Sequence, residues 1–157
     1  MRRALLAVLL PVAACGAGHE QVCTAMGAPD GVELDVRLLA AQTGTVEVCW
    51  DGRCVTRDLV LSPAYPAAGP ACTGGTSEAC ATSAGPAEWK LGTAPIPGMP
   101  AKQVTVRLKL LDAAGLPVVD RELTATAEKS YPNGPHCDPG EPLLALRVGA
   151  DGSVVQR

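Results

Sequence analysis

The chain has 157 residues, enough for one domain, with 13 Lys and Arg against 16 Asp and Glu and a net charge of −3. Without Arg2 and Arg3 the net charge is −5 and no run of basic residues is left, so the sequence argues against binding to nucleic acid. There is no Phe, and there are only two Trp and two Tyr, so the core must consist of Val, Leu and Ala and depends more on covalent cross-links.

The first residues have the pattern of a signal peptide, since two arginines precede an apolar run at 4–10 and small residues up to Cys15. This run is shorter than the about 20 residues of a transmembrane helix. Val12-Ala13-Ala14-Cys15 resembles the lipobox of bacterial lipoproteins, in which the cysteine is acylated after cleavage. We expect residues 1–14 to be removed, and acyl chains such as palmitate on Cys15 to anchor the exported chain to the outer face of the cell membrane through a tether at 15–22. The alternatives are an ordinary signal peptide with a chance cysteine, or a buried helix.

Six cysteines follow Cys15, and an even number in an exported chain predicts three disulfides. Asp51-Gly52 is a two-residue hairpin signal that places Cys49 opposite Cys54 at a non-hydrogen-bonded position, where Cα atoms lie about 4.5 Å apart. A second pair flanks a short loop rich in Gly, Ser and Thr. The predicted pairs are Cys49–Cys54, Cys72–Cys80 and Cys23–Cys137. Because no Cys-x-x-Cys pair occurs, we expect disulfides rather than a zinc site.

The first half of the domain predicts strands at 32–38, 46–50 and from 53 to about 61, each with alternating side chains or a flanking turn signal. Trp50 shares the apolar face of its strand and is assigned to the core. In the register set by the Asp-Gly turn, Arg53 and Arg57 fall on that same face. This placement requires either a bulge or a position at a sheet edge.

Residues 62–101 hold seven prolines and six glycines, and predict a long irregular insertion with one short strand at 88–91. Alternation returns at 103–110 and 118–128. A loop stiffened by proline follows at 131–140, before two last strands. The last strands span 144–148 and 154–156. Seven or eight short strands without an amphipathic helical window predict an all-β protein, an antiparallel β-sandwich in a single domain at 23–157.

Two resemblances add to this interpretation. The hairpin at 104–126 resembles one from bacterial immunoglobulin-like domains, which implies an immunoglobulin-like sandwich. The Val-Ala-Ala-Cys start, Cys23 soon after it, and the late segment Tyr-Pro-Asn-Gly-Pro-His-Cys-Asp-Pro at 131–139 resemble uncharacterised actinobacterial lipoproteins. That resemblance implies export and lipidation, and transfers no activity.

Motifs of common hydrolases are missing from the sequence. The domain has one histidine, His136, and contains no Gly-x-Ser-x-Gly, Ser-x-x-Lys, phosphate-loop or His-Glu-x-x-His motif. The acidic pairs that spacing allows are Asp138 with Glu141 and Asp35 with Glu33. We expect these carboxylates to be solvated surface charges, with a calcium site around Asn133 and the first pair as the alternative. The sequence predicts no catalytic residue, metal or cofactor.

These observations predict a non-enzymatic, membrane-tethered module that binds an envelope protein or a small ligand. An envelope hydrolase that uses acidic residues and a purely structural spacer are the alternatives. Recognition is expected in the two long loops, with the insertion favoured, because loops on a rigid scaffold commonly bind partners. The candidate binding residues are Tyr65, Trp89, Tyr131, Asn133 and His136.

Overall fold

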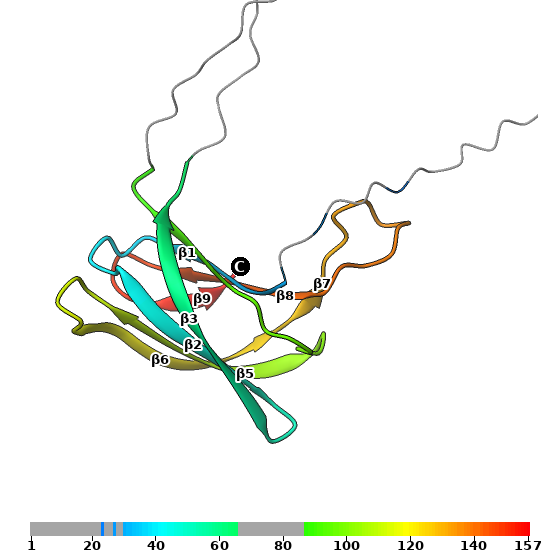
Figure 1. Cartoon of the computed structure of the whole chain (residues 1–157), viewed down its shortest axis with the longest axis horizontal. Helices are drawn as coiled ribbons and strands as arrows, with labels where there is room; N and C mark the ends of the chain where they lie inside the picture. Colours follow the sequence, from blue (N-terminus) through cyan, green and yellow to red (C-terminus); the bar gives the residue numbers. More distant parts are fainter. Residues whose placement is uncertain (1–22, 24–26, 28–29, 66–86) are drawn as a thin grey trace, which may run out of the picture.

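The computed structural model describes residues 23, 27, 30–65 and 87–157, which form an all-β fold (Figure 1). The nine strands of this part are β1 (Gly31–Val36), β2 (Thr43–Trp50), β3 (Arg53–Pro63), β4 (Lys90–Ala94), β5 (Gln103–Leu111), β6 (Pro117–Thr126), β7 (Glu128–Lys129), β8 (Pro142–Val148) and β9 (Val154–Gln156). Within these ranges no helix is long and apolar enough to cross a membrane. The predicted signal peptide, Cys15, the tether and the Cys72–Cys80 pair lie outside the described residues.

All nine strands belong to one sheet with the order β6-β5-β2-β3-β4-β1-β8-β7, and β9 pairs with β8. Neighbouring strands are antiparallel except β1 and β8, which run parallel. Only Ala127 separates β6 from β7, and β7 pairs with β8, so the two ends of the strand order meet and the sheet is nearly closed into a barrel (Figure 1). The all-β, mainly antiparallel prediction is confirmed. The immunoglobulin-like sandwich is not, because the described strands form one continuous sheet.

The seam of the barrel is completed by a side chain. The amide of Gln156 accepts a hydrogen bond from the Thr126 N–H and donates one to the Thr126 carbonyl, both at 2.8 Å. A glutamine amide has the same donor and acceptor as a peptide group, so it occupies the place of a strand backbone between β9 and the end of β6.

The core fills the inside of this curved sheet, because alternate residues of every long strand point inward. Leu34, Leu108 and Leu146 are completely inaccessible to solvent. Ile96 and Met99, from the segment after β4, are also buried in the core. The irregular insertion expected at 62–101 is therefore wrong at both ends. β3 extends to Pro63, and residues 90–101 contribute a strand and core side chains.

Two of the three predicted disulfides fall within the described residues, and both are present. Cys49 and Cys54 face each other across β2 and β3 with their Cα atoms 4.1 Å apart. The turn between them has positive φ at Asp51 (49°) and Gly52 (77°), as a two-residue type I′ hairpin requires. Cys23 and Cys137 join the start of the domain to the loop after β7.

Candidate functional site

The described surface carries two shallow depressions. One, of about 170 Å³, lies at the seam and is lined by residues of β6, β7, β8 and β9, by Arg157 and by Ser130. The buried hydroxyl of Ser130 has no hydrogen-bond partner among the described residues. The other, of about 220 Å³, lies on the outer face of β2, β3, β5 and β6 and is lined by residues such as Glu47 and Arg107. Neither is a deep enclosed cleft of the kind that commonly holds a small ligand.

The structure brings Tyr65 and Trp89 to the same place, at the base of segment 66–86. The Ala64 N–H donates to the Trp89 carbonyl at 3.0 Å, which continues the pairing of β3 and β4. Tyr65 is exposed, whereas the Trp89 ring is half-buried and lies under the Arg37 guanidinium, 4.4 Å from the ring centre. Trp89 therefore has a structural contact that the sequence did not indicate, and Tyr65 is the freer of the two.

The other three candidates, Tyr131, Asn133 and His136, lie in the loop between β7 and β8. This loop is held by the disulfide at Cys137 and by backbone hydrogen bonds from Gly134 to Tyr131 and from Gly140 to Ser130. Tyr131 and His136 are exposed, and Asn133 is half-buried. Among the described residues, no hydrogen bond, ion pair or ring contact joins the side chain of Tyr131 or His136 to Tyr65 or Trp89.

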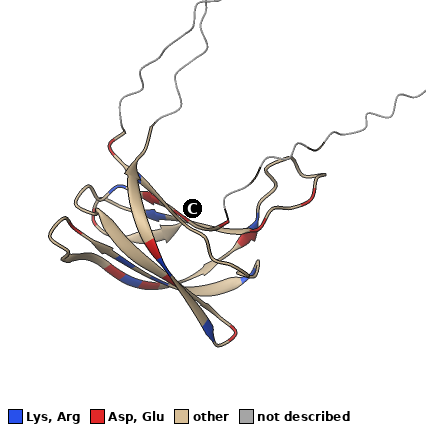
Figure 2. Ribbon diagram, in the orientation of Figure 1, with Lys and Arg blue, Asp and Glu red and all other residues tan. Residues whose placement is uncertain are grey.

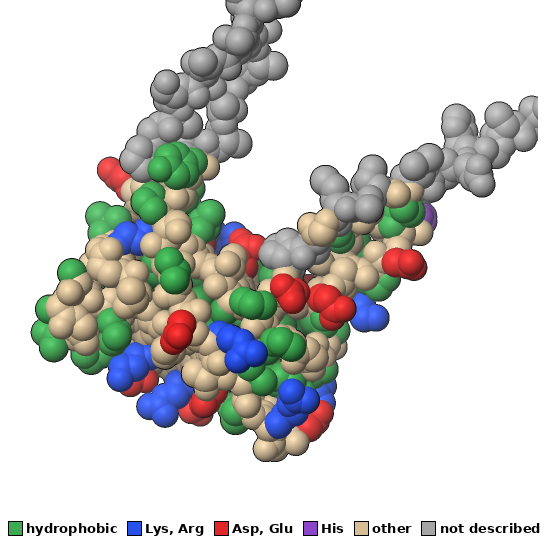
Figure 3. Space-filling model, viewed as in Figure 1, with side chains coloured by type: hydrophobic (Ala, Val, Ile, Leu, Met, Phe, Trp, Pro, Cys, Tyr) green, Lys and Arg blue, Asp and Glu red, His purple; other side chains and the backbone are tan. Residues whose placement is uncertain are grey.

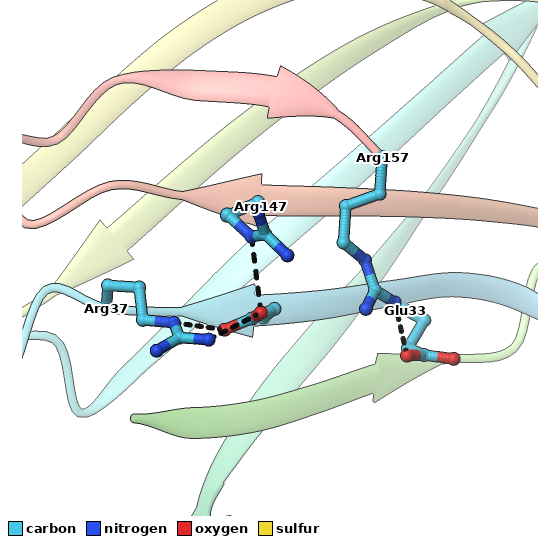
Figure 4. A network of polar contacts seen from close by, with 5 residues as sticks. Glu33, Arg37, Arg147 and Arg157 are labelled. Atoms are coloured by element: carbon cyan, nitrogen blue, oxygen red, sulfur yellow. Dashed lines mark hydrogen bonds and ion pairs between the residues drawn. The ribbon is translucent and has the colours of Figure 1, made fainter. Parts of the chain in front are cut away.

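Acidic residues of β1 are held by arginines rather than by each other (Figure 4). Asp35 is only 4% exposed and accepts hydrogen bonds from Arg37 Nε at 3.0 Å and Arg147 Nε at 3.3 Å. Glu33 accepts one from Arg157 at 2.6 Å. Asp35 is thus not the solvated charge that we expected. Arg37 lies two residues from Asp35, a spacing from which the contact could have been predicted, whereas Arg147 is 112 residues away in the sequence.

The predicted acidic pair Asp138 and Glu141 is exposed in its loop. Among the described residues, the one group of three His, Cys, Asp or Glu side chains whose ligand atoms converge is Glu47, Cys49 and Cys54, and the sulfurs of these two cysteines are bonded to each other. A thiolate is the form that binds metal, so the oxidised pair offers no metal site.

Two apolar side chains on the outer face of β3 and β4, and a third just beyond the end of β3, are exposed and take no part in the core. Val60 is 75% exposed, Tyr65 67% and Leu91 41%. The register pairs Val60 with Thr93 and Leu91 with Ser62, so Val60 and Leu91 are diagonal neighbours on one face. We call these three residues the β3–β4 patch. Figure 3 shows hydrophobic side chains at the C-terminal end of β3.

One half of β3 is an edge of the sheet. β3 pairs with β2 from Arg53 to Val60, but β4 reaches only Val60 to Pro63. Arg53 and Arg57 lie on this half, which we call the open edge (residues 53–59), and the hairpin that carries it extends away from β4 (Figures 1 and 2). Of the two solutions that the sequence left for these arginines, a bulge or an edge, the structure has the edge.

Comparisons with family models, with curated proteins and with solved structures found no match to this chain.

Proposed function

We propose that this chain is an exported lipoprotein that is held on the outer face of the cell membrane by acyl chains on Cys15 and acts there by binding a protein or small ligand of the envelope. The Val-Ala-Ala-Cys sequence supports lipidation. Two acyl chains suffice for stable anchoring. Cys23 is bonded to Cys137, and only seven residues lie between Cys15 and Cys23 in the sequence, so the domain would work close to the membrane.

The observation that supports binding is the β3–β4 patch. Val60 and Leu91 are exposed on two hydrogen-bonded strands and Tyr65 just beyond the end of β3, and their exposure has no explanation in the packing of the core. Exposed apolar patches on a soluble scaffold commonly mark sites of interaction. Tyr65 offers a large contact area that loses little conformational entropy on binding. Trp89 and Arg37 stiffen the base from which Tyr65 projects.

Photocrosslinking in intact cells tests this surface. A photoreactive residue in place of Tyr65 should give an adduct of discrete mass. The matched control is Thr124, which is exposed on the outer face of β6, and it should give none. Leu91→Thr should weaken the Tyr65 adduct without lowering stability by more than about 0.5 kcal/mol, because it is a surface substitution. Equal adducts from both positions, or none, would contradict binding at the patch.

The anchor is tested separately with a palmitate analogue. The wild-type chain should be labelled and Cys15→Ser should not. Equal labelling of the two would rule out acylation at Cys15, while leaving the crosslinking result interpretable.

The proposal also excludes catalysis. Hydrolysis of peptidoglycan, ester or peptide substrates that is lost in Asp138→Asn or Glu141→Gln would contradict it. The relation to immunoglobulin-like domains is a further part of the proposal, and it rests on the alternating hairpin of β5 and β6.

A further inference from the structure

The open edge of β3 has backbone groups that pair with none of the nine described strands. In an antiparallel pair, every second residue directs its N–H and carbonyl away from its partner. The pair Trp50–Arg53 closes the turn, so the residues of β3 that direct these groups away from β2 are Cys54, Thr56 and Asp58. Val60 follows in the same alternation, and it pairs with β4. Within the described part of the chain, the one further contact to these groups is from the Arg57 side chain to the Thr56 carbonyl, at 2.9 Å.

Two arginines flank this edge on one face of the strand. Arg53, Val55 and Arg57 alternate with the outward-directed residues, and both arginines are exposed. Neither forms an ion pair with any described residue. The Arg53 guanidinium lies 4.7 Å from the centre of the Trp50 ring, and Arg57 is hydrogen-bonded to its own strand. The cations are therefore held beside the edge and lack a carboxylate.

The acidic residues near the turn of the β2–β3 hairpin are either paired with a lysine or lie on the opposite face of the strand from Arg53 and Arg57. Asp51 is paired with Lys102 at 2.7 Å. Asp58 lies on the opposite face of the strand, with Cys54 and Thr56. A strand added to the open edge would place its side chains opposite Arg53, Val55 and Arg57 at about 4.5–5.5 Å between Cβ atoms, on the basic face.

We propose that the open edge of β3 binds an extended acidic peptide by strand addition, with carboxylates four residues apart that meet Arg53 and Arg57 and an apolar side chain between them that meets Val55. Backbone hydrogen bonds to Cys54, Thr56 and Asp58 would supply affinity, and the alternate side chains specificity. This site is separate from the β3–β4 patch and requires neither that patch nor the lipid anchor.

A second copy of the chain is a poorer occupant than an acidic segment. An antiparallel edge-to-edge dimer centred on Val55 would place Arg53 of each copy directly opposite Arg57 of the other. Like charges at directly opposite positions destabilise a strand pair. Inward-facing charges on an edge strand are also a common protection against self-association.

The test uses the full chain in detergent solution and fluorescent peptides of alternating Thr with Glu, Val and Glu at positions i, i+2 and i+4. Fluorescence anisotropy should show saturable binding, about tenfold tighter than for the same peptide with Lys in place of Glu. A peptide of equal composition with its Glu residues three apart should bind as weakly as the Lys peptide, because its carboxylates lie on opposite faces of the strand.

Two variants distinguish the contribution of the arginine charges to peptide binding from that of the backbone hydrogen bonds. Arg53→Gln with Arg57→Gln should weaken binding at least several-fold. The matched control is Arg121→Gln, which removes an exposed arginine without an ion pair from β6, and it should leave binding unchanged. Thr56→Pro removes an outward N–H that the sheet does not use, and proline is tolerated at such edge positions. It should abolish binding while the melting temperature shows that the fold persists.

Unchanged peptide binding in Thr56→Pro would show that the peptide binds through charge alone, and would overturn the proposal of strand addition. Equal binding of the two Glu spacings would do the same. A wild-type dimer in sedimentation that Thr56→Pro dissociates would assign the edge to a second copy instead. Loss of the Tyr65 adduct in cells with peptide binding intact would count against the proposed function alone.

Discussion

Replacement of Gln156 by leucine should open the seam of the barrel. The Gln156 amide makes two hydrogen bonds of 2.8 Å to the backbone of Thr126, and none of the described strands pairs with Thr126 on this side. Leucine has a similar size but neither donor nor acceptor. The sheet should then separate locally between β9 and the end of β6, while the pairing of β7 with β8 persists.

The expected cost follows from the two lost contacts. A neutral hydrogen bond contributes about 0.5–1.5 kcal/mol net, and Thr126 is exposed, so water can partly replace the amide. We expect the free energy of unfolding to fall by about 1 kcal/mol and the melting temperature by roughly 3–6 °C. Gln156→Glu should be at least as destabilised at neutral pH, because a carboxylate cannot donate to the Thr126 carbonyl. Its deficit should shrink below a pH of about 4, because a protonated carboxyl can donate.

Urea unfolding measures the stability, and hydrogen exchange of the Thr126 amide measures the seam itself. The matched control is Gln103→Leu, since Gln103 faces Thr126 from β5 and its exposed side chain makes no hydrogen bond within the described residues. Exchange at Thr126 should accelerate in Gln156→Leu only. Unchanged stability and exchange in that variant, or an equal loss in the control, would refute closure by the side chain.

Three further predictions concern other contacts. Asp35→Ala should lower the free energy of unfolding by about 2 kcal/mol. This loss is smaller than for a fully buried ion pair because the Arg147 side chain is 47% exposed, and a double-mutant cycle with Arg147→Ala should show coupling between the two residues. Leu108→Ala should cost about 3 kcal/mol in urea unfolding with an unchanged denaturant slope, because the side chain is completely buried. The Ser153 hydroxyl and backbone N–H hold the pKa of the Asp151 carboxyl below its ordinary value of 3.8, so this contribution to stability is present above that pH and lost as pH falls through the lowered value. Carboxyl NMR titration should find the midpoint below 3.8 in the wild type and nearer to 3.8 in Ser153→Ala.

Local features of the sequence were enough to predict most of the strands. Strict alternation marks β1 and β5 because successive side chains of a strand point to opposite faces. Asp51-Gly52 fixed the register of β2 and β3, and with it the facing of Cys49 and Cys54, because a two-residue turn leaves one pairing of the flanking residues. The same register placed Arg53 on the apolar side of the hairpin.

Prediction failed where composition masked the pattern. Prolines and glycines suggested an irregular insertion with one short strand at 88–91, whereas β4 spans Lys90–Ala94. Gly92 pairs within the sheet and allows the Leu61 side chain to pack against its backbone. Tyr65 was correctly foreseen as exposed. Trp89, the other candidate in this part of the chain, is half-buried under Arg37 instead.

The sequence by itself determined most of the elements, the hairpin turn at Asp51-Gly52 and two disulfide pairings, because these depend on residues that are close in the chain or have no other partner. Only the tertiary structure decided which strands are neighbours: the parallel pairing of β1 with β8, the burial of Asp35 between arginines, the seam at Gln156 and the open edge of β3. Each of these joins segments far apart in sequence or depends on where a neighbouring strand ends. Alternation records which face of a strand is buried, but carries no information on which strand lies beside it.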